Sequence, residues 1–222
     1  MAKPQEKVVT LDFSRKYNRA QSMRYFEKHD FGFRRKITTW REISIAKKAL
    51  KIAGNPTSVL DLPCGAGRFW KMLAKAPRAW LFAADLSEDM LEVAETYQEP
   101  EIVNRFQLFQ SSAFDIKMSD NSVDNILCMR LLHHISDSEN RLRILRELHR
   151  VTNDTLILSM WVDGNLQAKN RQKLENKRGK SRSINRLAIS QEQAELECRD
   201  AGFKIVKHID LLPKISMWRF IF

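Results

Sequence analysis

A carboxylate, a glycine turn and a second carboxylate follow one another in the central part of the chain. The run Val59-Leu60-Asp61-Leu62-Pro63-Cys64-Gly65-Ala66-Gly67 has the pattern of a buried strand that enters a tight turn. Glycine is favoured where a backbone passes close to a ligand, because a Cβ atom there would collide with it. Eighteen residues after Gly67, an apolar run ends on Asp85, where a doubly wound fold places a carboxylate that binds both hydroxyls of a ribose. The spacing therefore indicates a site for a ribose-containing ligand.

Each of these features has a simpler interpretation. A Gly-x-Gly turn alone is often only a tight corner between a strand and a helix, and an acid such as Asp85 can serve as a turn or helix cap. Because Ser87 can cap the next helix, Asp85 stays available for the ribose. The dinucleotide fingerprint has a third glycine three positions after the second, and this chain has Trp70 there. A nicotinamide enzyme is therefore disfavoured.

Two further segments follow strand-like runs. Residues 111–115 (Ser-Ser-Ala-Phe-Asp) could present a backbone N–H and an aromatic ring to a purine. Residues 123–134 form a fourth strand-like run that ends on a pair of histidines. Ligands of open α/β sheets bind at the carboxyl ends of the strands, so four such elements in this order are a stronger signal than any one of them.

The positions of these residues depend on an alternation of strands and helices. Short apolar runs alternate with stretches of helical spacing, which predicts an α/β fold with a mainly parallel, doubly wound sheet. The expected strands are residues 58–62, 80–84, 106–109, 123–131, 155–161, 203–209 and 216–222. The expected helices are residues 14–29, 37–53, 69–75, 88–97, 138–151 and 191–200.

At 222 residues the chain is expected to form one ordinary domain. We expect residues 1–54 to be an N-terminal helical lid or substrate region and residues 55–222 to be the core. A basic insertion at about 163–190 breaks the alternation and is expected to be mobile or partly helical.

The motif Asp61-x-x-Cys64-Gly65-x-Gly67, together with Asp85 and the His133-His134 segment, resembles class I S-adenosylmethionine-dependent methyltransferases. The resemblance covers about residues 58–222 and implies a Rossmann-like, seven-stranded sheet whose last strand is antiparallel. It also implies S-adenosylmethionine as the cofactor. The residues implied to bind it are Asp61, Pro63, Cys64, Gly65 and Gly67 near the methionine part, Asp85 and Leu86 near the ribose, Ser112, Ala113 and Phe114 near the adenine, and Met129 and Arg130 along the methyl channel. Ser112 departs from the pattern, since many relatives have an acid beside the adenine.

Three side chains are candidates for catalysis. His133 and His134 could supply a general base near neutral pH, although a histidine here often serves packing and hydrogen bonding. Tyr25 could close over the cofactor from an N-terminal helix, although aromatic residues on a helix are more often packed in the core. Methyl transfer to a neutral nucleophile needs little acid–base help, because the protein mainly aligns the reactants.

The net charge of +11 is concentrated in two segments. Residues 1–51 hold 14 Lys and Arg against 5 Asp and Glu, and residues 163–186 hold 8 against 2. Such segments attract acidic or polyanionic partners, or simply keep a surface solvated. The chain's size and general appearance resemble the pseudomonad lysine methyltransferases that modify elongation factor Tu, which favours a protein lysine acceptor. A small molecule or lipid, RNA, and a cofactor-binding module without transferase activity stay open as alternatives.

Cysteine usage and hydropathy bear on the environment of the protein. Cys64, Cys128 and Cys198 lie far apart and are not spaced with histidines as zinc ligands, so neither disulfides nor a metal site is indicated. No run of eighteen apolar residues occurs, and residues 1–10 lack the apolar centre of a signal peptide. We therefore expect a cytoplasmic protein without a membrane span.

Overall fold

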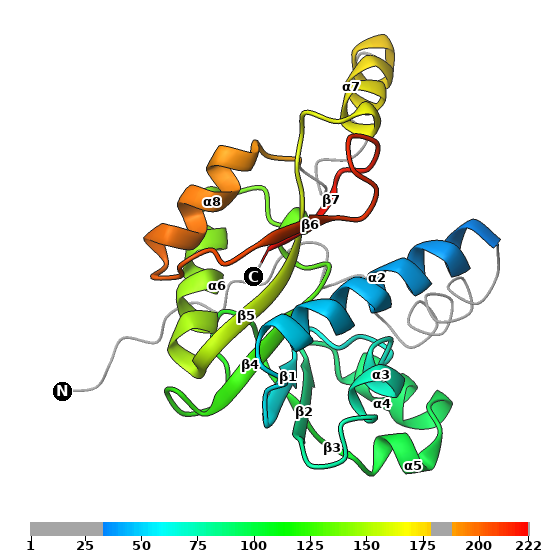
Figure 1. Ribbon diagram of the computed structural model, residues 1–222, viewed down its shortest axis with the longest axis vertical. Helices are drawn as coiled ribbons and strands as arrows, with labels where there is room; N and C mark the ends of the chain where they lie inside the picture. Colours follow the sequence, from blue (N-terminus) through cyan, green and yellow to red (C-terminus); the bar gives the residue numbers. More distant parts are fainter. Residues whose placement is uncertain (1–32, 179–187, 222) are drawn as a thin grey trace.

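The computed structural model describes residues 33–178 and 188–221. Within these ranges one seven-stranded sheet crosses the molecule in the order β3-β2-β1-β4-β5-β7-β6 (Figure 1). Its strands are β1 (Ser58–Asp61), β2 (Trp80–Asp85), β3 (Phe106–Gln110), β4 (Val123–Cys128), β5 (Thr152–Trp161), β6 (His208–Asp210) and β7 (Trp218–Ile221).

Strands β1 to β5 pair in parallel, whereas β7 runs antiparallel to both of its neighbours. The strand order reverses direction between β1 and β4, which is the topological switch point at which doubly wound sheets bind ligands. The predicted α/β fold class is therefore confirmed, including the antiparallel last strand.

Helices cover both faces of the sheet. They are α2 (Phe33–Ile52), α3 (Trp70–Leu73), α4 (Glu88–Tyr97), α5 (Pro100–Val103), α6 (Ser138–Val151), α7 (Leu166–Arg178) and α8 (Gln191–Asp200), with a short 3-10 helix, η2 (Leu132–His134). One hydrophobic cluster includes residues of α6 and α8, and a second includes residues of α2, α3, α4 and α5. In Figure 1, α7 projects from the body beyond the end of β5.

Three helices begin on side-chain caps and match the predicted ranges. Ser87 accepts from the Met90 amide at the start of α4, and Asp137 does so from the Asn140 amide at the start of α6. Ser190 caps α8 in the same way. These caps satisfy amides that the first turn of a helix leaves unpaired, which is why the boundaries could be predicted from sequence.

Strand β4 ends earlier than predicted. It stops at Cys128 rather than at residue 131, because Arg130 adopts a left-handed conformation with a φ of 61° that no extended strand allows. The chain then enters η2, so the two predicted candidates His133 and His134 lie on a helical turn instead of following an extended strand.

The predicted strand at residues 203–209 is mostly wrong. Only His208–Asp210 pairs in the sheet, because Gly202, with a φ of 101°, turns the chain after α8 and Phe203 packs edge-on against His149 of α6. The basic insertion is helical at α7, and the predicted helix at residues 14–29 lies outside the described residues.

The described part of the predicted N-terminal region is α2, which packs on the core. Its residues Ile45, Ala46 and Ala49 are buried in the same cluster as Val59 of β1 and Ile157 of β5. The division of the chain at residue 54 stays a prediction. Among the described residues, no helix is long and apolar enough to cross a membrane.

Candidate cofactor site

Two aspartates end neighbouring parallel strands at the same edge of the sheet. Asp61 is the last residue of β1 and Asp85 the last residue of β2. The Asp85 carboxylate accepts hydrogen bonds from the amides of Gly65 and Ser87, each at 2.9 Å. Burial raises the pKa of Asp85, although these amides act in the opposite direction. Asp85 thus joins the glycine turn to the corner between β2 and α4.

The Asp61 carboxylate has no such partners. It is fully buried, and neither of its oxygens makes a hydrogen bond within the described part of the chain. Burial raises its pKa well above the usual value of 3.8, and the negative charge of Asp85 raises it further. The indole N–H of Trp70 lies near enough to lower the pKa, but it does not complete a hydrogen bond.

A buried carboxylate without hydrogen bonds is costly, and such groups are rare in native proteins. A ligand that brought an ammonium group to this edge would satisfy Asp61. The methionine part of S-adenosylmethionine carries an ammonium, so the donor set of the site fits the predicted cofactor.

The glycine turn provides room beside these carboxylates. Gly65 has a φ of 53°, and a Cβ atom built there would meet nothing within 4 Å. Gly67 has a φ of 74°, and its Cβ would approach the Trp70 ring to 2.8 Å. Gly67 is thus required by packing, whereas Gly65 leaves open space at the site. Pro63 follows a cis peptide bond, and the Cys64 amide donates to the carbonyl of Ala84.

Trp70 explains the missing third glycine. Its side chain is completely buried and stacks on Phe106 with the ring centroids 4.7 Å apart. In addition, the side-chain amide of Gln98 donates to the Ala66 carbonyl at 2.8 Å and supports the turn from α4. The turn is therefore held by the packing of Trp70 and by the hydrogen bond from Gln98.

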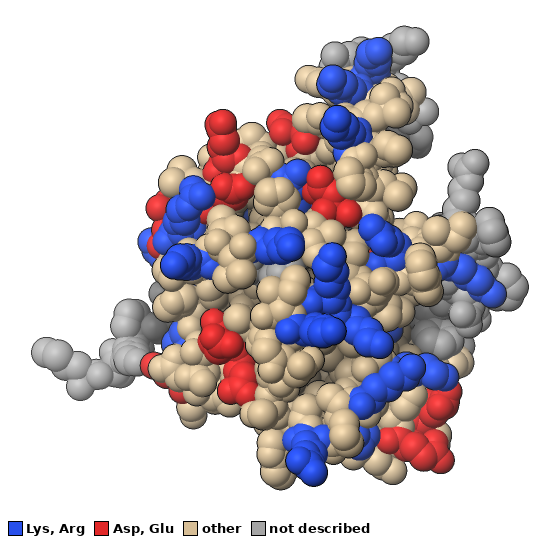
Figure 2. All heavy atoms as spheres, viewed as in Figure 1, with Lys and Arg blue, Asp and Glu red and all other residues tan. Residues whose placement is uncertain are grey.

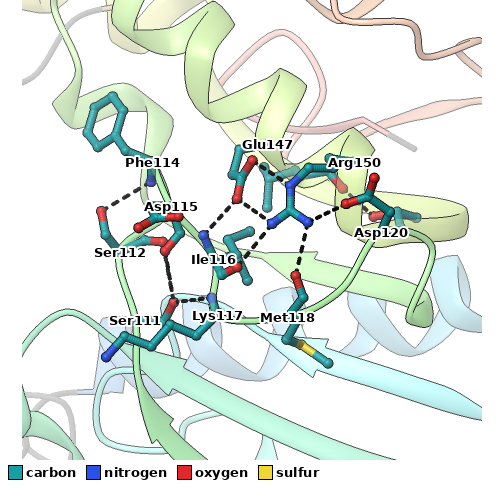
Figure 3. Close-up of polar contacts among 12 residues, drawn as sticks. Ser111, Ser112, Phe114, Asp115, Ile116, Lys117, Met118, Asp120, Glu147 and Arg150 are labelled. Atoms are coloured by element: carbon teal, nitrogen blue, oxygen red, sulfur yellow. Dashed lines mark hydrogen bonds and ion pairs between the residues drawn. The ribbon is translucent and has the colours of Figure 1, made fainter. Parts of the chain in front are cut away.

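The loop after β3, residues 111–118, carries the predicted adenine-side residues (Figure 3). The Ser112 hydroxyl accepts from the Phe114 amide at 3.1 Å, and the Ser111 hydroxyl accepts from the Lys117 amide at 3.0 Å. The Phe114 amide, one candidate to bind the adenine, is thus already bonded within the loop.

Helix α6 fixes this loop from outside. The Glu147 carboxylate accepts from the Ile116 amide at 2.7 Å, and the Arg150 guanidinium donates to the carbonyls of Ile116 and Met118 (Figure 3). The guanidinium of Arg143 lies 5.5 Å from the centre of the Phe114 ring. These helix residues are four and three positions apart and lie on one face of α6.

We call the hydrogen bonds from Glu147 and Arg150 to residues 116–118 the α6 brace. Sequence reasoning did not identify it. Glu147 and Arg150 have the spacing of an ordinary ion pair on a helix, and they do pair at 2.6 Å. The sequence offers no signal that both also reach the backbone of residues 116–118. Burial raises the pKa of Glu147, but the Arg150 and Ile116 hydrogen bonds outweigh this effect and leave the pKa below 4.5.

After β4, Met129 is buried and Arg130 reaches across to α2. The Arg130 guanidinium contacts both oxygens of Glu42, at 2.7 and 2.8 Å, and Arg68 of the glycine turn contacts the same carboxylate at 2.9 Å. Glu42 is almost fully buried. This cluster joins α2, the turn after β1 and the end of β4, and sequence reasoning missed both Glu42 and Arg68. The only available signal was a lone acid within a basic helix.

The histidine pair lies near the end of β5. The His133 ring is buried and stacks on Trp161, with centroids 4.7 Å apart and an angle of 17° between the planes. The His134 ring is tilted against it at 4.1 Å. Arg171 of α7 lies 5.2 Å from the centre of the Trp161 ring. This stacking agrees with the packing interpretation for His133, and a catalytic role stays a prediction.

The structure brings most of the predicted cofactor residues to one edge of the sheet. Leu86 is partly exposed beside Asp85, and its carbonyl accepts from Gln110 at 3.1 Å. Ala113 packs against the cluster on the α6 side. Tyr25 lies outside the described residues.

Comparison with known proteins bears on what this edge binds. Residues 59–155 match the family model of a methyltransferase domain. A demethylmenaquinone methyltransferase of Geobacillus stearothermophilus is 27% identical over 146 residues, which are 65% of this chain and 56% of that protein. The corresponding protein of Geobacillus kaustophilus is 27% identical over 138 residues, or 61% and 53% of the two chains. The chain thus spans about half the length of the curated relatives it matches.

Among solved structures, the magnesium protoporphyrin IX methyltransferase of Synechocystis, with bound SAH, superimposes with a TM-score of 0.76. It is 17% identical, and the match covers 94% of this chain and 96% of that one. The predicted Rossmann-like fold is confirmed, and the match over residues 59–155 supports the prediction of an S-adenosylmethionine-dependent methyltransferase.

Proposed function

We propose that the protein transfers a methyl group from S-adenosylmethionine to a small, largely apolar acceptor. The observation that carries the cofactor assignment is Asp61, a buried carboxylate without hydrogen bonds in the described chain, beside a glycine turn with open space at Gly65. An ammonium, a ribose and an adenine in one ligand correspond to Asp61, Asp85 and the loop after β3.

The bound cofactor would supply a methyl group on a positively charged sulfur, which is already activated for transfer. The work of the chain is then to bind, orient and exclude water. Asp61 would hold the ammonium by charge, Asp85 would accept hydrogen bonds from the ribose hydroxyls, and Phe114 would border the adenine. Met129 and Trp161 are buried at the same edge of the sheet, and His133 stacks on Trp161.

The small acceptor is favoured by the relatives that have a described substrate. Their names indicate menaquinone precursors and magnesium protoporphyrin as acceptors. Both are small molecules, as opposed to macromolecules, with a conjugated ring system and extensive apolar surface. We infer an acceptor of that general chemistry, without assigning either molecule.

A lysine on an acidic protein is the second candidate, with elongation factor Tu as the example that the sequence favours. The observation in its favour is the basic character of α2, whose exposed charged side chains are all lysines among those described. A lysine must lose its proton before it can attack, and nearby positive charge lowers an amine pKa. None of the relatives reported above is described as a protein methyltransferase.

One experiment separates these candidates. The protein is incubated with methyl-labelled cofactor and a bacterial lysate, and label is counted in the organic-soluble, protein and RNA fractions. We expect label in the organic-soluble fraction. Label in protein would assign the lysine alternative, label in RNA would assign a nucleic-acid acceptor, and cofactor binding without any transfer would leave a binding module.

A further inference from the structure

Two neighbouring segments expose apolar and basic side chains together. On α2 and on residues 211–217, the exposed side chains include five lysines and five large apolar residues: Lys36, Lys47, Lys48, Lys51 and Lys214, and Ile37, Trp40, Ile52, Leu212 and Ile215. None of the exposed side chains described on these segments is acidic. Figure 2 shows Lys and Arg side chains gathered along α2. We call these ten residues the α2 surface.

The α2 surface is continuous along the helix. Lys36, Trp40, Lys47 and Lys51 are spaced by four, seven and four residues, which places them on one face of α2. The Nε of Arg41 donates to the carbonyl of Leu211 at 3.3 Å, which joins the helix to residues 211–217. Trp40 is 67% exposed, although burying a tryptophan is strongly favourable.

We propose that the α2 surface docks on an anionic lipid bilayer. Lysines and a tryptophan beside aliphatic side chains are the composition with which proteins bind the interface of such membranes. Four of the five apolar residues are aliphatic and offer no stacking plane for bases, which argues for lipid over nucleic acid. The positive charge complements the anionic headgroups.

The opposite face of the same helix contacts residues beside the proposed cofactor site. Two residues after Trp40, Glu42 is buried and bonded to Arg130 and Arg68. Docking through α2 would therefore place the site beside the bilayer, where an apolar acceptor is concentrated. This part of the inference rests on the proposed function.

The test is co-sedimentation of the full chain with vesicles of phosphatidylcholine, with and without phosphatidylglycerol. We expect binding only to the anionic vesicles, and binding that weakens as salt shortens the Debye length from about 10 Å to about 3 Å. Lys47→Gln with Lys48→Gln should lower vesicle binding at least tenfold, since each lysine near an anionic surface contributes a factor of about five.

The chain offers matched controls. Lys204→Gln with Lys207→Gln removes the same charge from an exposed segment before β6 and should leave vesicle binding unchanged. Trp40→Ala should weaken binding, whereas Trp80→Ala should not. Trp80 is also 67% exposed, but it alternates with Leu81 and so points to the face of the sheet opposite α2.

Binding of S-adenosylhomocysteine (SAH), the demethylated product of the cofactor, separates this inference from the proposed function. It is measured by calorimetry on the same variants. Intact SAH binding with no vesicle binding would overturn the membrane inference alone. Equal loss in the two double-lysine variants, or tighter binding of single-stranded RNA than of anionic vesicles, would also overturn it. Vesicle binding without SAH binding would overturn the proposed function instead.

Discussion

The loop after β3 and the end of β1 both belong to the proposed cofactor site, but they differ in how many of their polar groups form hydrogen bonds. In the loop, the amides of Phe114, Ile116 and Lys117 all donate to side chains of the protein. At the end of β1, just before the turn, the carboxylate of Asp61 is buried without a hydrogen bond in the described chain.

This difference indicates in which half of the proposed site the ligand would supply partners for polar groups that the described chain leaves without a hydrogen bond. The proposed adenine side is held by hydrogen bonds within the loop and from α6, and it should keep its shape without ligand. The proposed methionine side has a buried carboxyl group without a hydrogen bond in the described chain, so the free energy of that half should change most when a ligand binds.

Loss of the Asp85 carboxylate should have the largest effect on binding. Asp85→Ala removes the acceptor for the Gly65 and Ser87 amides and the proposed acceptor for the ribose hydroxyls. Charge-assisted hydrogen bonds contribute about 1.5 to 3 kcal/mol each. We expect the affinity for SAH to fall by about a hundredfold or more, as measured by calorimetry.

Asp124→Ala is the control for Asp85→Ala. Asp124 accepts from the Thr57 hydroxyl and amide at the other end of the sheet, and these bonds hold its pKa below the usual value. Its loss should lower stability and leave SAH affinity unchanged. Wild-type affinity in Asp85→Ala would remove the ribose assignment.

Asp61→Asn should change how the stability of the ligand-free protein depends on pH. Because the folded-state pKa of Asp61 is raised, its contribution is fully present below about pH 3.8 and is lost as the pH rises through the raised value. Relative to wild type, Asp61→Asn should therefore gain stability with rising pH, measured by urea unfolding. A constant difference between the two proteins across pH would contradict an elevated pKa.

Breaking the α6 brace should have an intermediate effect. Arg150→Met removes the hydrogen bonds to the carbonyls of Ile116 and Met118. We expect SAH binding to weaken by about tenfold and the free energy of unfolding to fall by about 1 to 3 kcal/mol. Arg199→Met on α8 removes an exposed pair with Glu195 and should change neither. SAH binding as tight as in wild type would show that the loop does not need the brace.

The lowered pKa of Glu147 should make the stability of the protein depend on pH in the acid range. Because its pKa is lowered, its stabilising contribution is present above pH 4.5 and is lost as the pH falls through the lowered value. Glu147→Gln should flatten this part of the acid-unfolding profile. An unchanged profile would mean that the contacts of Glu147 add nothing to stability.

The smallest effect is expected for His134. If the acceptor is already nucleophilic, His134→Ala should change the rate of methyl transfer by only a few-fold, because orientation dominates the catalysis. A loss of about a hundredfold or more, with an unchanged affinity for SAH, would assign a general base instead.

The sequence was most informative where local rules decide the structure. The ranges of α4, α6 and α8 followed from caps and spacing, and the carboxylates Asp61 and Asp85 followed from the ends of apolar runs. Such features depend on neighbours in the chain, so they are visible without tertiary structure.

Contacts between distant segments were not predictable. Glu42 meets Arg130 across 88 positions of the chain, and Glu147 reaches Ile116 across 31. The left-handed conformation of Arg130, which ends β4 early, was likewise not visible in the local apolar pattern. Sequence spacing carries no information on pairings of this kind.

The central claim is that an ammonium group of the ligand balances the negative charge of the Asp61 carboxylate. Calorimetry of SAH binding over a series of pH values, in two buffers with different enthalpies of ionisation, tests it most directly. An ammonium beside Asp61 favours the ionised carboxylate, so binding to the wild type should release protons, and Asp61→Asn should abolish that release and weaken binding. No SAH binding by the wild type, or the same proton release from Asp61→Asn, would contradict the account.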